Sequence, residues 1–321
     1  MAQSLFRLLR EKDPTRAIDV VAPRWSLPVL QRMPEVRRGI ALDVRHGEFG
    51  WGKRRSLGRE LGARRYEQAI VLPRSAKAAL VPWFAGIERR TGFKGELRFG
   101  LLNDIRPFDR ARLDQTVKRF TALGLDPGES LPDALPRPLL TSNQVAQHDI
   151  RRKLGLGKNK PLIALLPGAE YGPAKCWPLA NFGALARLLS QSDYRVAVLG
   201  GPGDRDAGDE IVNHSGGQAI NCCGDTTLAE ACDLLAACDA VVTNDSGLMH
   251  MAAAVGTRIV ALYGSTSPHF TPPLTPRARI IHLELDCSPC FKRVCPLEHL
   301  NCLNGIRPER VMDELRALLA E

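Results

Sequence analysis

The stretch DAVVTNDSGLMHMAAAV, residues 239–255, decides the fold of this chain. Its apolar run over 240–242 predicts a buried strand, and the run over 247–255 predicts a buried helix directly after a short turn. Asp245, Ser246 and Gly247 occupy that turn. Two interpretations are open. The side chains cap the helix, or the free N–H groups and the helix dipole form an anion site that needs small residues for close approach.

The same alternation of short apolar runs and amphipathic helical segments continues on both sides of this stretch. It is typical of parallel α/β units, and it predicts two doubly wound parallel-sheet domains in tandem. The Pro-rich stretch over 126–138 predicts a linker. Strands are predicted at 18–21, 68–72, 162–166, 195–199, 219–222, 240–243, 258–263 and 280–283. Helices are predicted at 50–65, 76–85, 112–123, 178–190, 228–237, 247–255 and 308–319.

The composition of the 321 residues is that of an ordinary globular protein, and the length favours two domains. No apolar run approaches the roughly 20 residues of a membrane span. Charges at Arg7 and Arg10 interrupt the start of the chain, so we expect no signal peptide and a cytoplasmic protein. Its nine cysteines are then expected to be mostly reduced.

The net charge of +9 is unevenly distributed along the chain. Residues 1–150 hold 27 Lys and Arg against 17 Asp and Glu, whereas residues 151–321 hold 17 against 18. Each basic pair alone suits a solvated surface, but the asymmetry as a whole favours an anionic partner of the first half. Aromatic residues make up only 6% and no nucleic-acid-binding motif is present, so a phosphorylated substrate or an anionic membrane surface is favoured over nucleic acid.

Four loops at the carboxyl ends of the predicted strands carry small and charged residues, and ligands bind at this edge of doubly wound sheets. Lys175 ends a glycine-bearing loop and is a candidate to neutralise a diphosphate. Asp204 or Asp206 is a candidate to hold a ribose hydroxyl, with N-capping as the alternative. The combination suits a nucleotide diphosphate. GxGxxG and GxxxxGK[ST] are both missing, which disfavours hydride transfer and ATP hydrolysis.

Several longer motifs resemble glycosyltransferase family 9, the heptosyltransferases of lipopolysaccharide core synthesis. In the second half these are PGAEYGPAKCWPLANF (167–182), NDSGLMHMAAAVG (244–256), ALYGSTSP (261–268) and CSPCFKRVCPLEHLNCLNGIRPERV (287–311). In the first half they are WSLPVLQRMPEV (25–36), HGEFGWGKRR (46–55) and LVPWFAGIERRTGFKGELRFGLLND (80–104). The resemblance spans nearly the whole chain.

This resemblance implies a GT-B fold, with two Rossmann-like domains facing a cleft. Residues 1–145 would form the acceptor-binding domain, and residues 146–321 the ADP-heptose-binding domain with its terminal helix. The implied reaction is an inverting transfer of L-glycero-D-manno-heptose from ADP-heptose to heptosyl-Kdo2-lipid A. It needs no cofactor or metal, and it would take place peripherally on the cytoplasmic face of the inner membrane.

The resemblance also implies roles for particular residues. Lys175 would contact the donor diphosphate, and Asp204 or Asp206 would lie near the ribose. Donor-binding residues in the opening stretch would be Asp245, Ser246, Gly247, Leu248 and His250, although a structural role for His250 is an equal alternative. Acceptor phosphates would meet Ser75, Lys77 and Arg98.

The beginning of the chain departs from the family pattern, which starts with a strand, a Gly-Asp loop and a helix. Residues 1–10 match that helix, so about 15 residues of strand and loop are missing. Either Met1 is an internal methionine, which we favour, or the chain is damaged or truncated. In both cases we expect the strands beside the missing one to lack partners. The family's general base would lie in the missing loop. Asp13 and Asp19 lie beyond the helix and cannot be given its role, so the catalytic residue stays unassigned.

Cys287, Cys290, Cys295 and Cys302 lie within 16 residues. Their spacing permits a zinc or iron–sulfur site, and packing of small buried side chains is the favoured alternative.

Two further functions remain open: a catalytically inactive chain that binds an ADP-sugar, and another family 9 heptosyltransferase with a different acceptor. A nucleotide-sugar epimerase is disfavoured because a Tyr-x-x-x-Lys dyad paired with a glycine-rich first loop is missing.

Overall fold

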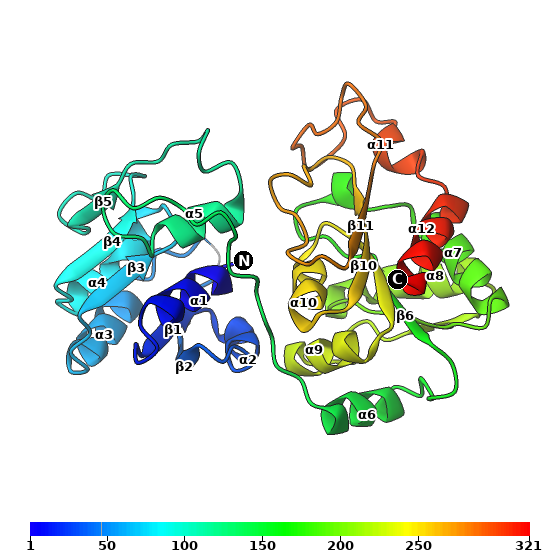
Figure 1. Cartoon of the computed structure of the whole chain (residues 1–321), viewed down its shortest axis with the longest axis horizontal. Coiled ribbons are helices and arrows are strands. Elements are labelled where there is room, and N and C mark those ends of the chain that lie inside the picture. The colour runs from blue at the N-terminus through cyan, green and yellow to red at the C-terminus, as the bar shows by residue number, and fades with distance from the viewer. Residues whose placement is uncertain (46) are drawn as a thin grey trace. The chain divides into compact units, whose positions relative to one another are not determined.

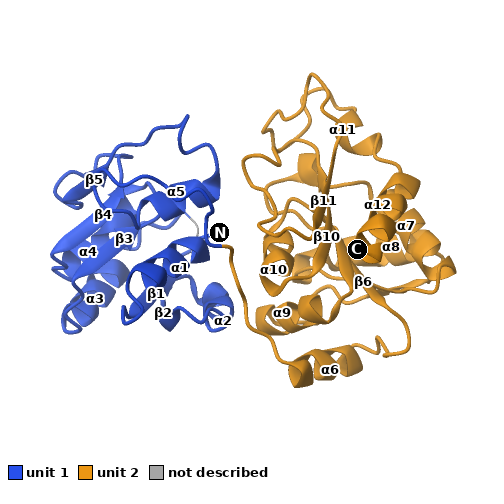
Figure 2. Ribbon diagram, in the orientation of Figure 1, with its two compact units in different colours: residues 1–136 blue, residues 137–321 orange. Residues whose placement is uncertain are grey.

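The structure is a computed structural model that describes residues 1–45 and 47–321. The chain divides into two compact units, Met1–Pro136 and Arg137–Glu321, which Figure 2 shows in different colours. The boundary expected between residues 145 and 146 falls inside α6 (Gln144–Lys153), a helix of the second unit. Within the described part of the chain, no helix is both long and apolar enough to cross a membrane.

The second unit is built on a six-stranded parallel sheet with the order β11-β10-β9-β6-β7-β8. Its strands are β6 (Leu162–Leu166), β7 (Arg195–Val198), β8 (Ala219–Asn221), β9 (Ala240–Asn244), β10 (Arg258–Tyr263) and β11 (Ala278–His282). The two central strands, β6 and β9, are buried along their whole length. Their sequences LIALL and AVVTN therefore face helices on both sides, as expected for a parallel sheet.

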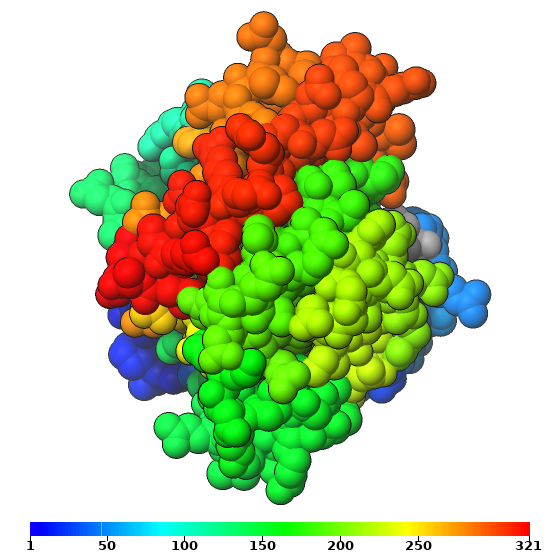
Figure 3. All heavy atoms as spheres, turned by 90° about the vertical axis from the view of Figure 1, so that its right-hand side faces the viewer, coloured from blue at the N-terminus to red at the C-terminus, as the bar shows by residue number. Residues whose placement is uncertain are grey.

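Helices cover both faces of this sheet (Figure 1). On one face lie α7 (Leu179–Gln191), α8 (Arg205–His214) and α12 (Pro308–Ala320), and on the other lie α9 (Leu228–Ala237) and α10 (Gly247–Val255). Short elements are η3 (Pro173–Lys175), η4 (Pro202–Asp204) and α11 (Asn301–Asn304). The terminal helix α12 packs on α7, beside which it lies on the surface in Figure 3. This is the doubly wound arrangement predicted from the sequence.

Every strand pair among the described residues of the first unit is parallel, but the strands form two separate sheets, β1-β2 and β3-β4-β5. Its strands are β1 (Ile18–Ala22), β2 (Val36–Ala41), β3 (Gln68–Val71), β4 (Arg89–Phe93) and β5 (Asp104–Arg106). Its helices are α1 (Gln3–Lys12), α2 (Leu27–Leu30), α3 (Trp51–Gly62), α4 (Leu80–Phe84) and α5 (Thr116–Ala122), with η1 (Arg24–Ser26) and η2 (Ala76–Ala79).

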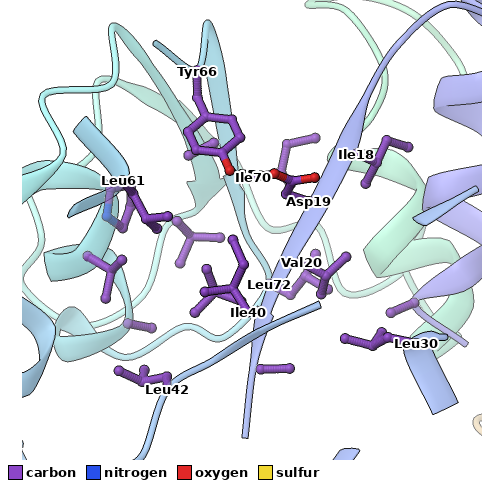
Figure 4. A pocket seen from close by; sticks show the side chains of 18 of the residues that line it. Ile18, Asp19, Val20, Leu30, Ile40, Leu42, Leu61, Tyr66, Ile70 and Leu72 are labelled. Atoms are coloured by element: carbon purple, nitrogen blue, oxygen red, sulfur yellow. Dashed lines mark hydrogen bonds between the residues drawn. The ribbon is translucent and has the colours of Figure 1, made fainter. Parts of the chain in front are cut away.

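A cavity of about 1990 Å³ lies where the first unit's sheet is divided (Figure 4). Ile18 and Val20 of β1 line it from one side, and Ile70 and Leu72 from the other. The apolar face of α1 contributes Leu5, Phe6 and Leu9. Among the described residues β1 is paired with β2 alone and β3 with β4 alone. We expected two strands with an unpaired edge, and β1 and β3 have this arrangement.

One polar network bridges the two sides of the cavity. The Asp19 side chain is only 2% exposed and accepts two hydrogen bonds from Arg37, Nε to Oδ1 at 2.8 Å and Nη2 to Oδ2 at 2.9 Å. The hydroxyl of Tyr66, just before β3, donates to Asp19 Oδ2 at 2.5 Å (Figure 4). The Arg37 guanidinium, followed by Tyr66, holds the pKa of Asp19 below its usual value even though burial acts in the opposite direction. Asp19 therefore has a structural role in this unit.

We predict that Asp19→Asn destabilises the first unit at neutral pH and that this loss of stability is smaller at pH 3. A carboxylate with a lowered pKa stabilises the fold above its ordinary pKa, and this contribution is lost as the pH falls below about 4. Losing charged hydrogen bonds in a buried setting costs about 1–3 kcal/mol. Urea denaturation, followed by circular dichroism at pH 7 and pH 3, measures the difference.

The control is Asp43→Asn, because Asp43 also receives Arg24 Nε at 3.0 Å and Nη2 at 2.5 Å, but both side chains are exposed. Exposed pairs add little to stability. An equal decrease in the free energy of unfolding for Asp19→Asn and Asp43→Asn at pH 7 would contradict the structural role of Asp19.

Candidate functional site

The candidate site lies at the carboxyl ends of β6 and β9, the two central strands of the second unit. The chain leaves β6 toward β7 on one side and leaves β9 toward β10 on the other. In doubly wound sheets the loops separate where the strand order reverses in this way, and ligands bind at that edge.

The buried side chain of Asn244, the last residue of β9, holds both ends of the loop that follows β6. Its Nδ2 donates to the carbonyl oxygen of Pro167 at 2.6 Å, and its Oδ1 accepts from the backbone N–H of Trp177 at 3.0 Å. An amide can do this because it carries a donor and an acceptor. Trp177 is itself fully buried, and its Nε1 donates to the Ile306 carbonyl at 2.9 Å. The loop over 167–177 is therefore fixed at both ends.

Inside this loop, Lys175 forms an ion pair with Asp245. Lys175 Nζ lies 2.7 Å from Asp245 Oδ2 and donates to the Asp245 carbonyl oxygen at 3.0 Å. Both side chains are largely buried, with exposed fractions of 13% and 6%. The hydroxyls of Thr266 and Thr271 donate to the same Oδ2, at 2.8 and 3.3 Å. The pair thus joins the loops after β6, β9 and β10.

The N-terminus of α10 lies beside this pair. Ser246 is its N-cap, and its Oγ accepts the backbone N–H of Met249 at 3.3 Å. A Cβ added to Gly247 would meet no heavy atom within 4 Å, so open space adjoins the first residue of the helix. Leu248 and His250 follow in the first turn, and the His250 backbone N–H donates to the Ser246 carbonyl at 3.4 Å. Ser246 therefore caps the helix, and the open space at Gly247 leaves room for the anion site, which stays a prediction.

Asp204, rather than Asp206, lies against the loop that follows β6. A Cβ on Gly168 would stand 2.8 Å from both carboxylate oxygens of Asp204, and one on Gly200 would stand 2.7 Å from Oδ2. Glycine at both positions allows this close approach. Asp204 Oδ2 also accepts the Gly201 N–H at 2.8 Å. Asp206 is exposed in the first turn of α8.

The loop over 284–300 forms a further wall, which the sequence did not lead us to expect. The Tyr171 hydroxyl donates to the Phe291 carbonyl at 2.8 Å, and Arg293 Nε donates to the Tyr171 carbonyl at 2.7 Å. The Ala174 N–H donates to the Arg293 carbonyl at 3.1 Å. Lys175 Nζ stands 5.5 Å from the centre of the Tyr171 ring, within range of a cation–π contact.

The four cysteines of the candidate metal cluster belong to this loop and to α11. All are free thiols, and burial raises the pKa of Cys302. Within residues 1–45 and 47–321, no group of three or more His, Cys, Asp or Glu side chains could hold a metal ion.

The acceptor candidates of the first unit differ in accessibility. Ser75 and Lys77 line the cavity, and Lys77 Nζ donates to the Glu48 carbonyl at 3.3 Å. Arg98 is only 2% exposed, and its guanidinium donates to the carbonyl oxygens of Pro73, at 2.7 Å, and Phe93. A buried guanidinium turned toward backbone carbonyls offers no exposed charge to a phosphate. We therefore assign Arg98 a structural position and retain Ser75 and Lys77 as acceptor candidates.

Comparison with known proteins gives one consistent result. The model of glycosyltransferase family 9 (heptosyltransferase) matches residues 54–301. Lipopolysaccharide heptosyltransferase 2 of Escherichia coli K12 is 43% identical over all of this chain and 95% of its own length. Lipooligosaccharide heptosyltransferase 2 of Haemophilus influenzae is 41% identical over all of this chain and 96% of its own length.

The solved structure of E. coli ADP-heptose LPS heptosyltransferase II is similar, with a TM-score of 0.89 and 42% identity. The match covers 99% of this chain and 94% of that one, which confirms the GT-B class. The chain belongs to glycosyltransferase family 9, the heptosyltransferases.

Proposed function

We propose that the protein transfers L-glycero-D-manno-heptose from ADP-heptose to heptosyl-Kdo2-lipid A in lipopolysaccharide inner-core synthesis. As a family member it is a glycosyltransferase, and the four curated relatives that match at 40–44% identity, over 95–96% of their own lengths, are heptosyltransferases 2. The observation that carries the site assignment is the Lys175–Asp245 pair beside the N-terminus of α10. It puts a cation and a helix dipole at the topological switch point.

The donor diphosphate binds at this place. An ammonium has three N–H donors, and two contacts to Asp245 leave Lys175 with capacity for a phosphate oxygen. The open space at Gly247 admits the phosphate to the first N–H groups of α10. Ser246, Leu248 and His250 border the same turn, and Asp204 holds a ribose hydroxyl across the Gly168 loop.

In the reaction the acceptor hydroxyl attacks the anomeric carbon of heptose on the side opposite the diphosphate. The new C–O bond forms as the bond from the anomeric carbon to the diphosphate oxygen breaks, and ADP leaves with the electron pair. The hydroxyl proton passes to a base, for which we assign no residue of this chain. Lys175 and the α10 dipole stabilise the negative charge that develops on the leaving diphosphate.

The acceptor is met by the first unit. The charge excess of residues 1–150 suits a phosphorylated lipid A precursor, and Ser75 and Lys77 are its proposed phosphate contacts. Because that acceptor carries acyl chains, the protein works peripherally at the cytoplasmic face of the inner membrane.

A second candidate is a chain that binds the ADP-sugar without transferring heptose. The cavity between β1 and β3 favours it, since the second unit's sheet is complete while the first unit's sheet is divided. ADP titration by calorimetry and ADP release from ADP-heptose with heptosyl-Kdo2-lipid A distinguish the two. Binding with release supports transfer, binding without release supports the second candidate, and failure to bind ADP contradicts both.

We predict that Lys175→Met weakens ADP binding by about 10- to 100-fold, because a hydrogen bond to a charged group contributes about 1.5–3 kcal/mol. Calorimetric titration measures the affinity, with the exposed Lys158→Met as the matched control. Lys175→Met leaves Asp245 buried without its cation, so the double variant Lys175→Met/Asp245→Asn separates folding from charge. It should fold normally and still bind ADP weakly. Wild-type affinity in both variants would refute the role.

We also predict that Gly247→Leu lowers ADP affinity at least tenfold without loss of stability. The new side chain meets no protein atom near its Cβ, and leucine favours a helix more than glycine does. It occupies the space through which an anion would reach the helix terminus. Gly52→Leu is the control, because Gly52 lies in the first turn of α3 with equally open surroundings. Equal ADP affinities for the two variants would argue against a phosphate at α10.

A further inference from the structure

Four aromatic rings form a continuous cluster on α3, α4 and the residues just before α3. Phe49, Trp51 and Trp83 are 53%, 50% and 43% exposed. The Phe49 and Trp51 rings stack with centroids 6.1 Å apart, Trp51 meets Phe84 edge-on at 5.1 Å, and Phe84 meets Trp83 at 4.9 Å. Single exposed apolar residues are ordinary, but a contiguous aromatic patch indicates an interaction surface.

The elements that carry this aromatic patch are held rigidly together. A Cβ on Gly58 of α3 would lie 2.4 Å from Phe84 Cβ and 2.7 Å from the Val81 carbonyl, so the two helices touch at this glycine. Figure 1 shows α3 and α4 side by side in the first unit. The buried Arg54 donates from Nε to the Phe49 carbonyl at 2.8 Å and fixes the approach to α3. The aromatic patch is therefore preorganised in the absence of a partner.

Cations border the aromatic patch. Lys53, Arg55 and Arg59 are exposed on α3. Positions four residues apart lie on one side of a helix, so Trp51, Arg55 and Arg59 form one stripe. Lys53 is paired with Glu48 at 2.9 Å. Aromatic side chains favour the headgroup level of a bilayer, and Lys or Arg beside them are attracted to anionic lipids.

We propose that the aromatic patch and the α3 cations dock the protein on the surface of an anionic bilayer. The proposal rests on the proposed function, because a lipid-anchored acceptor has to be reached at such a surface. The rings would sit at headgroup depth while Arg55 and Arg59 face lipid phosphates. In this arrangement, binding to the bilayer requires both the aromatic patch and the cations of α3.

The test is sedimentation of the full chain with vesicles of phosphatidylglycerol and phosphatidylcholine in equal parts. Trp51→Ser/Trp83→Ser should lower the bound fraction at least tenfold at any salt concentration. Arg55→Gln/Arg59→Gln should lower the membrane partition coefficient by roughly fivefold per charge at low salt, and the difference should fade at high salt. Trp25→Ser is the control, since Trp25 is 72% exposed in the same unit but lies outside the aromatic patch.

Unchanged binding of either double variant at low salt, or equal binding of the wild type to pure phosphatidylcholine, would overturn the proposal. A dimer in sedimentation velocity that is lost in the tryptophan variant would assign the patch to a second copy instead. Heptose transfer to a deacylated, soluble acceptor should be equal in wild type and both variants. A wild type that binds vesicles but never transfers would refute the proposed function and leave the docking surface supported.

Discussion

The second unit's site depends on one buried amide. Asn244 ends the central strand β9 and satisfies the carbonyl of Pro167 and the N–H of Trp177, so a loop of irregular backbone stays in one place over the sheet edge. Two contacts of the site depend on the position of that loop. Gly168 admits the Asp204 carboxylate, and Lys175 reaches the residue next to the amide. A buried polar group of this kind is costly unless all its partners are present, and here both ends of the amide are used.

The Lys175–Asp245 ion pair beside Asn244 is stable in the free protein and also holds a cation where an anionic ligand can bind. Burying a charge is expensive, and a pair is tolerated when additional hydrogen bonds complete it. Thr266 and Thr271 supply them to Asp245, which leaves Lys175 held at a defined point. A diphosphate arriving there meets a cation that has already lost most of its water and its freedom. Positioning before binding reduces the cost of association.

How much could be read from the sequence depends on burial. LIALL, AVVTN and RIVALY each contain an uninterrupted apolar run because their strands face helices on both sides, and all three strands were predicted. The strands β2 (VRRGIA) and β4 (RRTGF) were not predicted, because arginines and glycines interrupt their apolar pattern. The loop motifs pointed to Lys175 and Asp245, but not to their pairing. The positions of Arg98, Asn244 and the 284–300 loop result from contacts between distant segments, which no local pattern records.

The divided sheet of the first unit has an energetic consequence. The pocket of about 1990 Å³ between β1 and β3 is open to solvent, so the apolar side chains that line it, such as Ile18, Val20 and Ile70, stay partly in contact with water. Burial of apolar surface is the main favourable contribution to folding, so this part of the first unit gains less stability than the filled core of the second unit. The free energy of local opening is therefore expected to be lower in the first unit than in the second. In a hydrogen-exchange map, the amides of β1 and β3 would exchange first and those of β6 and β9 last.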